Sequence, residues 1–354
     1  MRRVAVAVTL LSLLACGPDE AVPGDAGPEP VAPTLTPQAS GTSALLQAVS
    51  PVNDEVAWAS GHEGAVVRTL DGGDTWTTVP TPVGDSLQFR DVHAFSAEEA
   101  ALLTAGNGPA SRLYHTTDGG STWTLAYLME DERGFLDCLD FWDARGFAYG
   151  DSFDGIPFVL RSGDGGRTWS RLAPGVLPTA PEGEGGFAAS GTCARVAEDG
   201  VGWIATGAGG AARILRTSDH GASWEAAEVP VVRGDAAGLT TVSFRDLLVG
   251  IALGGDLAQM EVHTDNAARS TDGGVSWLTG SRPRLVGPVY GSDWVPGTDV
   301  VVAVGPGGAD WSADGGSSWM ALDTLTYWAA AFASPSAGWM VGPGGRITNV
   351  SLTR

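Results

Sequence analysis

The side chains best suited to chemistry in this chain lie in two loops, at residues 150–154 and 254–266. They are Asp151, Asp154, Asp256, Glu261, His263 and Asp265. Carboxylate oxygens are the ligands that Ca²⁺ takes in proteins, and a pair of carboxylates can hydrolyse a glycosidic bond. The two loops therefore predict a face that binds a polar ligand or a cation such as calcium.

The overall charge offers a simpler interpretation of the same residues. The chain carries 41 acidic and 20 basic residues, a formal net charge of −21. Loops of so acidic a protein are acidic whether or not they bind anything, and this alternative stays open. The charge also argues against nucleic acid as a partner, because binding to phosphates requires a basic surface. No motif indicates a cofactor, and the identity of any metal is left open.

A motif repeated six times indicates the elements that carry these loops. Each copy, here called a box, reads Ser/Thr-x-Asp-x-Gly-x-Ser/Thr-Trp, and the first runs from Thr69 to Trp76. The box tryptophans are separated by 47, 46, 55, 53 and 42 residues. Repeats of roughly this length are the size of propeller blades. The box carboxylates are Asp71, Asp118, Asp164, Asp219, Asp272 and Asp314.

The chemistry of a box is structural. Its Asp can accept nearby backbone N–H groups, its Gly can adopt a positive φ, and its Trp can bury a large ring against a sheet. Between boxes, short apolar runs bounded by Gly, Pro and Asp predict β-strands. Four such strands per unit, repeated radially, make an all-β propeller of four-stranded antiparallel blades.

The number of blades follows from the C-terminal end of the sequence. After the last box, residues 327–350 predict three more strands without a box of their own. A strand from the N-terminal side, around residues 35–44, would complete this unit and close the ring. The sequence therefore predicts a seven-bladed β-propeller, and six blades is the alternative.

Alternating strand direction separates the boxes from the predicted site. The turn between the second and third strands of a blade shares a face with the links between blades, whereas the boxes lie on the opposite face. The box carboxylates are therefore expected to be scaffold. Cys138 and Cys193 fall at equivalent places on the first strands of consecutive blades, where a disulfide is feasible. Two buried thiols are the alternative, and no nearby His completes a metal site.

The repeat resembles the Asp-box, or BNR, repeat of sialidases, sortilin-type receptors and photosystem II assembly factors. The last group is the most similar, because Gly202-Trp203 and Gly338-Trp339 each begin the Gly-Trp segment that precedes its third strand. The resemblance covers residues 40–354 and implies a propeller with an assembly or chaperone-like role. Nothing in the sequence indicates photosynthesis, so the photosystem partner is not carried over.

The N-terminus predicts export and lipidation. Two arginines precede an apolar run that ends in Leu13-Leu14-Ala15-Cys16, which resembles the lipobox of bacterial lipoproteins. That resemblance implies a signal peptide over residues 1–15, acylation of Cys16 and an outer-membrane location. Residues 16–38 are rich in Pro, Ala, Gly and acids and predict a flexible tether. Residues 39–354 form the predicted propeller domain.

Enzyme classes find little support. Sialidases need three arginines around a carboxylate, whereas the arginines that precede the boxes here fall on third strands, away from the axis. Asp151 with Asp256 could form a glycoside hydrolase pair, which remains the alternative function. The sequence favours a monomeric, non-catalytic propeller, anchored by lipid in the bacterial cell envelope, that binds an envelope protein or a glycan.

Overall fold

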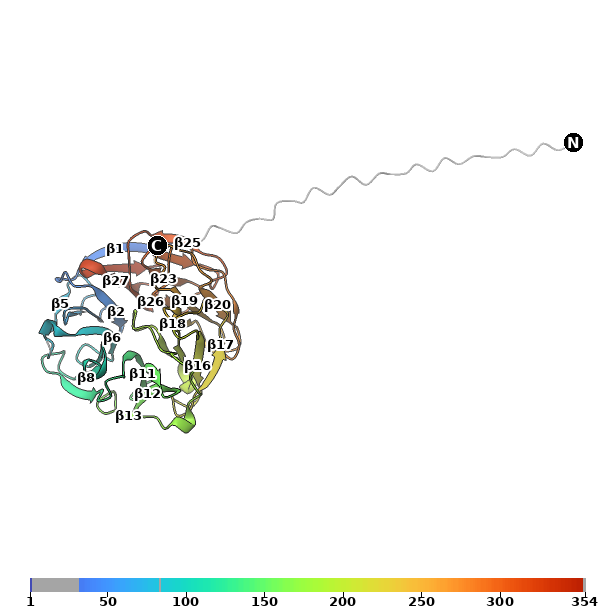
Figure 1. Ribbon diagram of the computed structural model, residues 1–354. Helices are drawn as coiled ribbons and strands as arrows, with labels where there is room; N and C mark the ends of the chain where they lie inside the picture. Colours follow the sequence, from blue (N-terminus) through green and yellow to red (C-terminus); the bar gives the residue numbers. More distant parts are fainter. Residues whose placement is uncertain (2–31, 83, 353–354) are drawn as a thin grey trace. The chain divides into compact units, whose positions relative to one another are not determined.

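Seven four-stranded antiparallel sheets are arranged in a ring, which confirms the seven-bladed β-propeller and rejects the six-bladed alternative (Figure 1). The computed structural model describes Met1, residues 32–82 and residues 84–352. The predicted signal peptide, Cys16 and most of the predicted tether lie outside these residues. Within the described residues, no helix is long and apolar enough to cross a membrane.

Six blades each take four consecutive strands, in the order in which the chain makes them. Blade 1 contains β2 (Leu46–Pro51), β3 (Ala57–Gly61), β4 (Val66–Thr69) and β5 (Thr77–Thr78). Blade 2 contains β6 (Gln88–Ala94), β7 (Ala100–Ala105), β8 (Arg112–Thr116) and β9 (Thr124–Leu128). Blade 3 contains β10 (Leu136–Phe141), β11 (Gly146–Phe153), β12 (Ile156–Ser162) and β13 (Ser170–Arg171).

The second half of the ring repeats this pattern. Blade 4 contains β14 (Ala194–Val196), β15 (Gly202–Ala205), β16 (Arg213–Thr217) and β17 (Glu225–Glu228). Blade 5 contains β18 (Ala237–Phe244), β19 (Gly250–Asp256), β20 (Ala267–Ser270) and β21 (Leu278–Thr279). Blade 6 contains β22 (Gly291–Trp294), β23 (Val301–Gly305), β24 (Gly308–Ser312) and β25 (Met320–Asp323).

Blade 7 is completed by a strand from the other end of the chain. Its inner strands are β26 (Ala329–Ser334), β27 (Ala337–Gly342) and β28 (Arg346–Ser351), and β1 (Thr34–Ala39) pairs with β28 over its whole length. The strand begins at Thr34, so residues 34–38 belong to the propeller and not to the tether to which the sequence analysis assigned them. The alternation that would have marked this strand is weak, because it carries Pro37 and most of its side chains are exposed.

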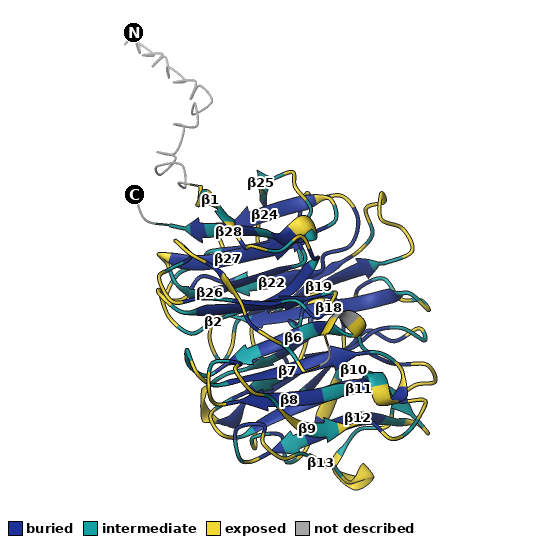
Figure 2. Ribbon diagram, turned by 90° about the vertical axis from the view of Figure 1, so that its left-hand side faces the viewer, coloured by how far each residue is buried: buried dark blue, intermediate teal, exposed yellow. Residues whose placement is uncertain are grey.

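The core lies between the faces of neighbouring blades. The second and third strands of most blades are buried almost throughout, whereas the short outer strands are exposed (Figure 2). Trp58, Trp203 and Trp339 occupy equivalent positions on second strands and are fully buried. Burying an aromatic ring of this size between two sheets supplies much of the energy that holds adjacent blades together.

Each box folds into the same hydrogen-bonded turn between the third and fourth strands. In the first box, Asp71 Oδ1 accepts the backbone N–H of Thr75 at 2.9 Å, and Asp71 Oδ2 accepts its hydroxyl at 2.6 Å. The Thr69 hydroxyl donates to the same carboxylate and accepts the N–H of Gly73. In the fifth box, the Ser276 hydroxyl and N–H lower the pKa of Asp272 to about 2. These carboxylates are engaged in holding turns.

Arginines on third strands join neighbouring blades at the boxes. Arg161 Nε donates to His220 O in the next blade at 3.1 Å, and Arg216 Nε donates to Gly273 O at 2.9 Å. Arg68 and Arg269 likewise reach Gly119 and Ser317 in the following boxes. These side chains lie far out along the blades, as the sequence analysis expected, and they serve as contacts between blades.

Gln38 of β1 fixes the closure of the ring. Its amide oxygen accepts the indole N–H groups of Trp76 and Trp339, both at 3.0 Å, and its amide nitrogen donates to Gly72 O at 3.1 Å. We therefore expect Gln38→Met, which keeps the length of the side chain, to lower the free energy of unfolding by about 1–3 kcal/mol. Urea unfolding followed by tryptophan fluorescence measures this change. Thr36→Ala, on the same strand but exposed, is the control, and equal stability of both variants would contradict the role of Gln38.

Candidate functional site: the filled channel and the linking face

The link between blades 3 and 4, residues 172–193, is longer than any other between blades, and its second half fills the centre of the ring. Gln47 Nε2 of blade 1 donates to Ala189 O, and Arg90 Nη1 of blade 2 donates to Ala188 O. On the opposite side of the ring, the Ser190 hydroxyl donates to Tyr290 O, next to blade 6, at 2.7 Å. A segment that contacts inner strands on opposite sides must lie on the axis. We call residues 184–192 the plug.

Three glycines of the plug pack directly against three carboxylates of blades 2 and 3. A Cβ atom added to Gly185 would collide with Asp151, one on Gly186 would lie 2.5 Å from Asp137 Oδ2, and one on Gly191 would collide with Asp91. These positions therefore have no space for a side chain. The Gly186 N–H donates to Asp151 Oδ1 at 3.0 Å.

Burial raises the pKa of each of these three carboxyls. For Asp137 the negative charge of Asp151 adds to the effect of burial. Asp91 still accepts two backbone N–H groups, from Val92 at 2.8 Å and from Leu139 of the next blade at 2.7 Å. Asp91 and Asp151 thus act as acceptors for backbone that would otherwise be buried without partners, whereas, among the described residues, both oxygens of Asp137 are buried without a hydrogen bond.

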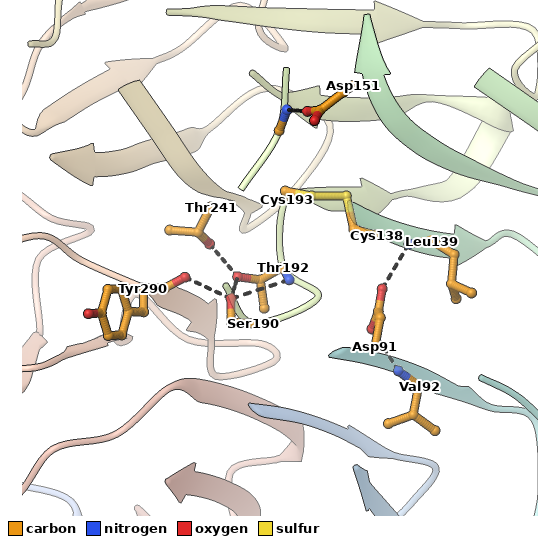
Figure 3. Close-up of a disulfide and its surroundings, with 11 residues drawn as sticks. Asp91, Val92, Cys138, Leu139, Asp151, Ser190, Thr192, Cys193, Thr241 and Tyr290 are labelled. Atoms are coloured by element: carbon orange, nitrogen blue, oxygen red, sulfur yellow. Dashed lines mark hydrogen bonds between the residues drawn. A yellow bond between two sulfur atoms is a disulfide. The ribbon is translucent and has the colours of Figure 1, made fainter. Parts of the chain in front are cut away.

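Both ends of the plug are attached firmly to the blades. At its start, Glu184 is fully buried and forms a bidentate ion pair with Arg213, with Nε–Oε1 at 2.7 Å and Nη2–Oε2 at 2.5 Å. Just after its end, Cys193 forms a disulfide with Cys138 of blade 3 across Cα atoms 6.0 Å apart (Figure 3). Cys138 lies on β10, whereas Cys193 directly precedes β14, the first strand of the next blade; the disulfide that the blade alignment made feasible is present.

The six loop residues of the sequence analysis do not form one site. Asp151 packs against Gly185 of the plug and accepts the N–H of Gly186. Asp154 is exposed and pairs with Arg133 at 2.9 Å, and Asp256 accepts the Ala258 N–H within its own turn. Glu261, His263 and Asp265 are exposed in the loop between β19 and β20. Across residues 32–82 and 84–352, no group of three or more His, Cys, Asp or Glu side chains is arranged to hold a metal ion.

The linking face carries an apolar area that the sequence analysis missed. Four exposed side chains form it, and we call them the apolar patch: Met260, Val262, Val286 and Leu325. They come from three neighbouring loops. The carbonyl of Met260 packs against Gly287, which also contacts Pro306, and Pro306 O accepts the Thr326 hydroxyl at 2.9 Å. Beneath the patch, Tyr290 stacks on Trp328 with ring centres 4.4 Å apart, and its hydroxyl contacts Met260 Sδ.

In the loop at residues 257–266, apolar residues stand between the acids that the sequence analysis selected. Met260 and Val262 alternate with Glu261 and His263. Their exposure could not be inferred from the sequence, because apolar residues beside a strand are usually assigned to the core. The signal that could have revealed them is the length of this loop, the longest turn between second and third strands.

Known structures share this fold at low sequence identity. YCF48 bound to a D1 peptide is 16% identical, with a TM-score of 0.63, over 92% of this chain and 98% of that one. YCF48 from Cyanidioschyzon merolae is 15% identical, with a TM-score of 0.63, over 91% and 99%. The WD40 propeller domain of Doa1 is 14% identical, with a TM-score of 0.60, over 90% and 98%. These likenesses establish the propeller fold alone.

Comparison with protein-family models gave no match, and comparison with curated protein sequences gave none either. The fold and the geometry of the faces therefore carry the functional argument.

The fit of the plug can be tested at its glycines. Because a Cβ on Gly186 would press against Asp137, we expect Gly186→Ala to destabilise the protein by about 1–3 kcal/mol and to speed hydrogen exchange within the plug. Gly175→Ala is the matched control, since Gly175 lies in the same link and a Cβ there meets open space. Hydrogen exchange measured by mass spectrometry distinguishes them. Equal protection of the plug in both variants would contradict the close fit.

Proposed function

We propose that this protein is a non-catalytic scaffold that binds a partner protein through its linking face while lipid at Cys16 holds it in the bacterial cell envelope. The observation that carries the proposal is the apolar patch over the Tyr290–Trp328 stack. Exposed apolar groups that lie together on one face are typical of protein–protein contacts, and Tyr, Trp and Met are enriched in such interfaces.

The comparison with YCF48 supports the same kind of function. That propeller was determined with a D1 peptide bound, so the fold is suited to holding a protein segment. The partner of this protein has to be inferred from its own surface, because at 16% identity no binding residue of YCF48 transfers to this chain. A protein partner is favoured over a glycan, since the patch is apolar and carries few hydrogen-bonding groups of its own.

The geometry gives a glycoside hydrolase no support. Asp151 is hydrogen-bonded to the plug and Asp256 holds its own turn, so the two carboxylates proposed for that reaction are already engaged. The envelope location rests on the sequence of the N-terminus, and it is supported by the disulfide, because disulfides persist in the oxidising periplasm and at cell surfaces.

Substitutions in the patch test partner binding. Full-length protein with Met260→Ser and Leu325→Ser should lose most of the partner that the wild type captures from envelope extracts, because two apolar anchors are removed. Quantitative mass spectrometry of the captured proteins measures the loss. Leu278→Ser is the control, since Leu278 is 75% exposed on an outer strand outside the patch. Unchanged capture by the double variant, or capture of glycan alone, would refute the proposal.

The anchor has an independent test. Cys16→Ser should release the protein from membranes into the soluble envelope fraction and abolish metabolic labelling with a palmitate analogue. Fractionation and labelling of cells that express the full chain measure both effects. Cys138→Ser is the comparison, because it removes a thiol that pairs inside the propeller and should leave labelling intact. Continued labelling of the Cys16 variant would exclude this anchor.

A further inference from the structure

Below the plug, on the side of the boxes, the axis of the ring holds a blind polar chamber. Its volume is about 170 Å³, and plug residues 190–192 close it toward the linking face. Asp91, Asp140, Arg195 and Asp293 are among the side chains that line it. Toward the box face it adjoins a second hollow of about 350 Å³, and Arg195 and Asp293 line both spaces. This ion pair therefore stands between the chamber and the outer hollow.

The ion pair of Arg195 and Asp293 is unusual because it joins two blades that are not neighbours. Arg195 lies on β14 of blade 4 and Asp293 on β22 of blade 6, with Arg195 Nη2 3.1 Å from Asp293 Oδ1. Within the described part of the chain, Arg195 Nε and Nη2 are buried and make no hydrogen bond. These two atoms form one edge of the guanidinium, which matches a carboxylate in a bidentate geometry. The pair is close in distance but leaves that edge unsatisfied.

The other charges around the chamber are already engaged. Asp140 Oδ1 lies 3.0 Å from His93 Nδ1, and Asp140 Oδ2 accepts the Val196 N–H at 2.9 Å. Both oxygens of Asp91 accept backbone N–H groups. Asp293 keeps its position through Oδ2, which accepts the Phe332 N–H at 3.0 Å. A ligand that separates Arg195 from Asp293 consequently breaks fewer hydrogen bonds than one that displaces Asp140 or Asp91.

Charge balance decides which ligand can open this pair. An anion that bound Arg195 would leave Asp293 facing a second negative charge, and a cation that bound Asp293 would leave Arg195 unpaired. Leaving a partly buried charge without a partner is strongly unfavourable. A zwitterion avoids both costs, because its carboxylate can take the unpaired edge of Arg195 once the pair has separated, while its ammonium group faces Asp293.

The geometry points to a binding site for a small zwitterionic amino acid, inserted between Arg195 and Asp293 at the chamber. The volume agrees with this class, since a cavity of about 150 Å³ is known to hold a molecule the size of benzene. Alanine and serine are of similar size, whereas larger amino acids would have to extend into the outer hollow. The site is separate from the apolar patch and does not depend on the proposed partner.

Calorimetric titration of the full-length protein tests this site. L-alanine and L-serine should bind saturably, whereas acetate, ethylamine and glycerol, which carry one charge or none, should bind at least about tenfold more weakly. Arg195→Met should weaken alanine binding about ten- to a hundredfold, as expected for losing charged hydrogen bonds. Arg145→Met, which removes an exposed arginine from a box-face loop, should leave binding unchanged.

Two further results would overturn the inference. Failure of both amino acids to bind at millimolar concentration would exclude the site, and binding of acetate or ethylamine as tight as that of alanine would assign it to a simple ion. If Arg195→Met fails to fold, as judged by circular dichroism, Arg195→Lys replaces it. Lysine keeps the charge but lacks the bidentate edge, so undiminished alanine binding by a folded Arg195→Lys protein would equally refute the role of Arg195.

Discussion

The structure depends on how the axis of the ring is filled. Seven inner strands cannot meet at a point, so a propeller of this size leaves a central space lined by backbone and side chains. Here a link of the chain itself occupies that space, and its backbone must find partners in a region with little water. The carboxyls of Asp91, Asp137 and Asp151 border the path of the plug, and Asp151 accepts the N–H of Gly186.

This solution determines much of the composition of the plug. Side chains larger than hydrogen cannot stand where Gly185, Gly186 and Gly191 meet carboxyls, and the residues between them are mostly small. It also explains why a charged group such as Glu184 is tolerated in the interior, since Arg213 satisfies both of its oxygens. The disulfide at Cys193 then limits how far the plug can move even if those polar contacts loosen.

The sequence was sufficient for the architecture because the boxes encode local structure. A turn closed by its own Asp and Ser or Thr forms wherever the motif occurs, so six boxes place six blades, and the leftover strands after Trp319 require a seventh. The cysteine pair was also accessible, since it follows from aligning neighbouring blades. The plug could not be predicted, because segments rich in Gly and Ala resemble linkers and their docking depends on residues far away in the sequence.

The same distinction explains the outcome for the loop carboxylates. Asp151 was recognised as a candidate by its type and its position at the end of a second strand, and the structure gives it a partner, Gly186, that no local pattern could supply. Because the plug fills the axis, the places that a ligand can reach are the rim of the linking face and the short blind chamber below the plug.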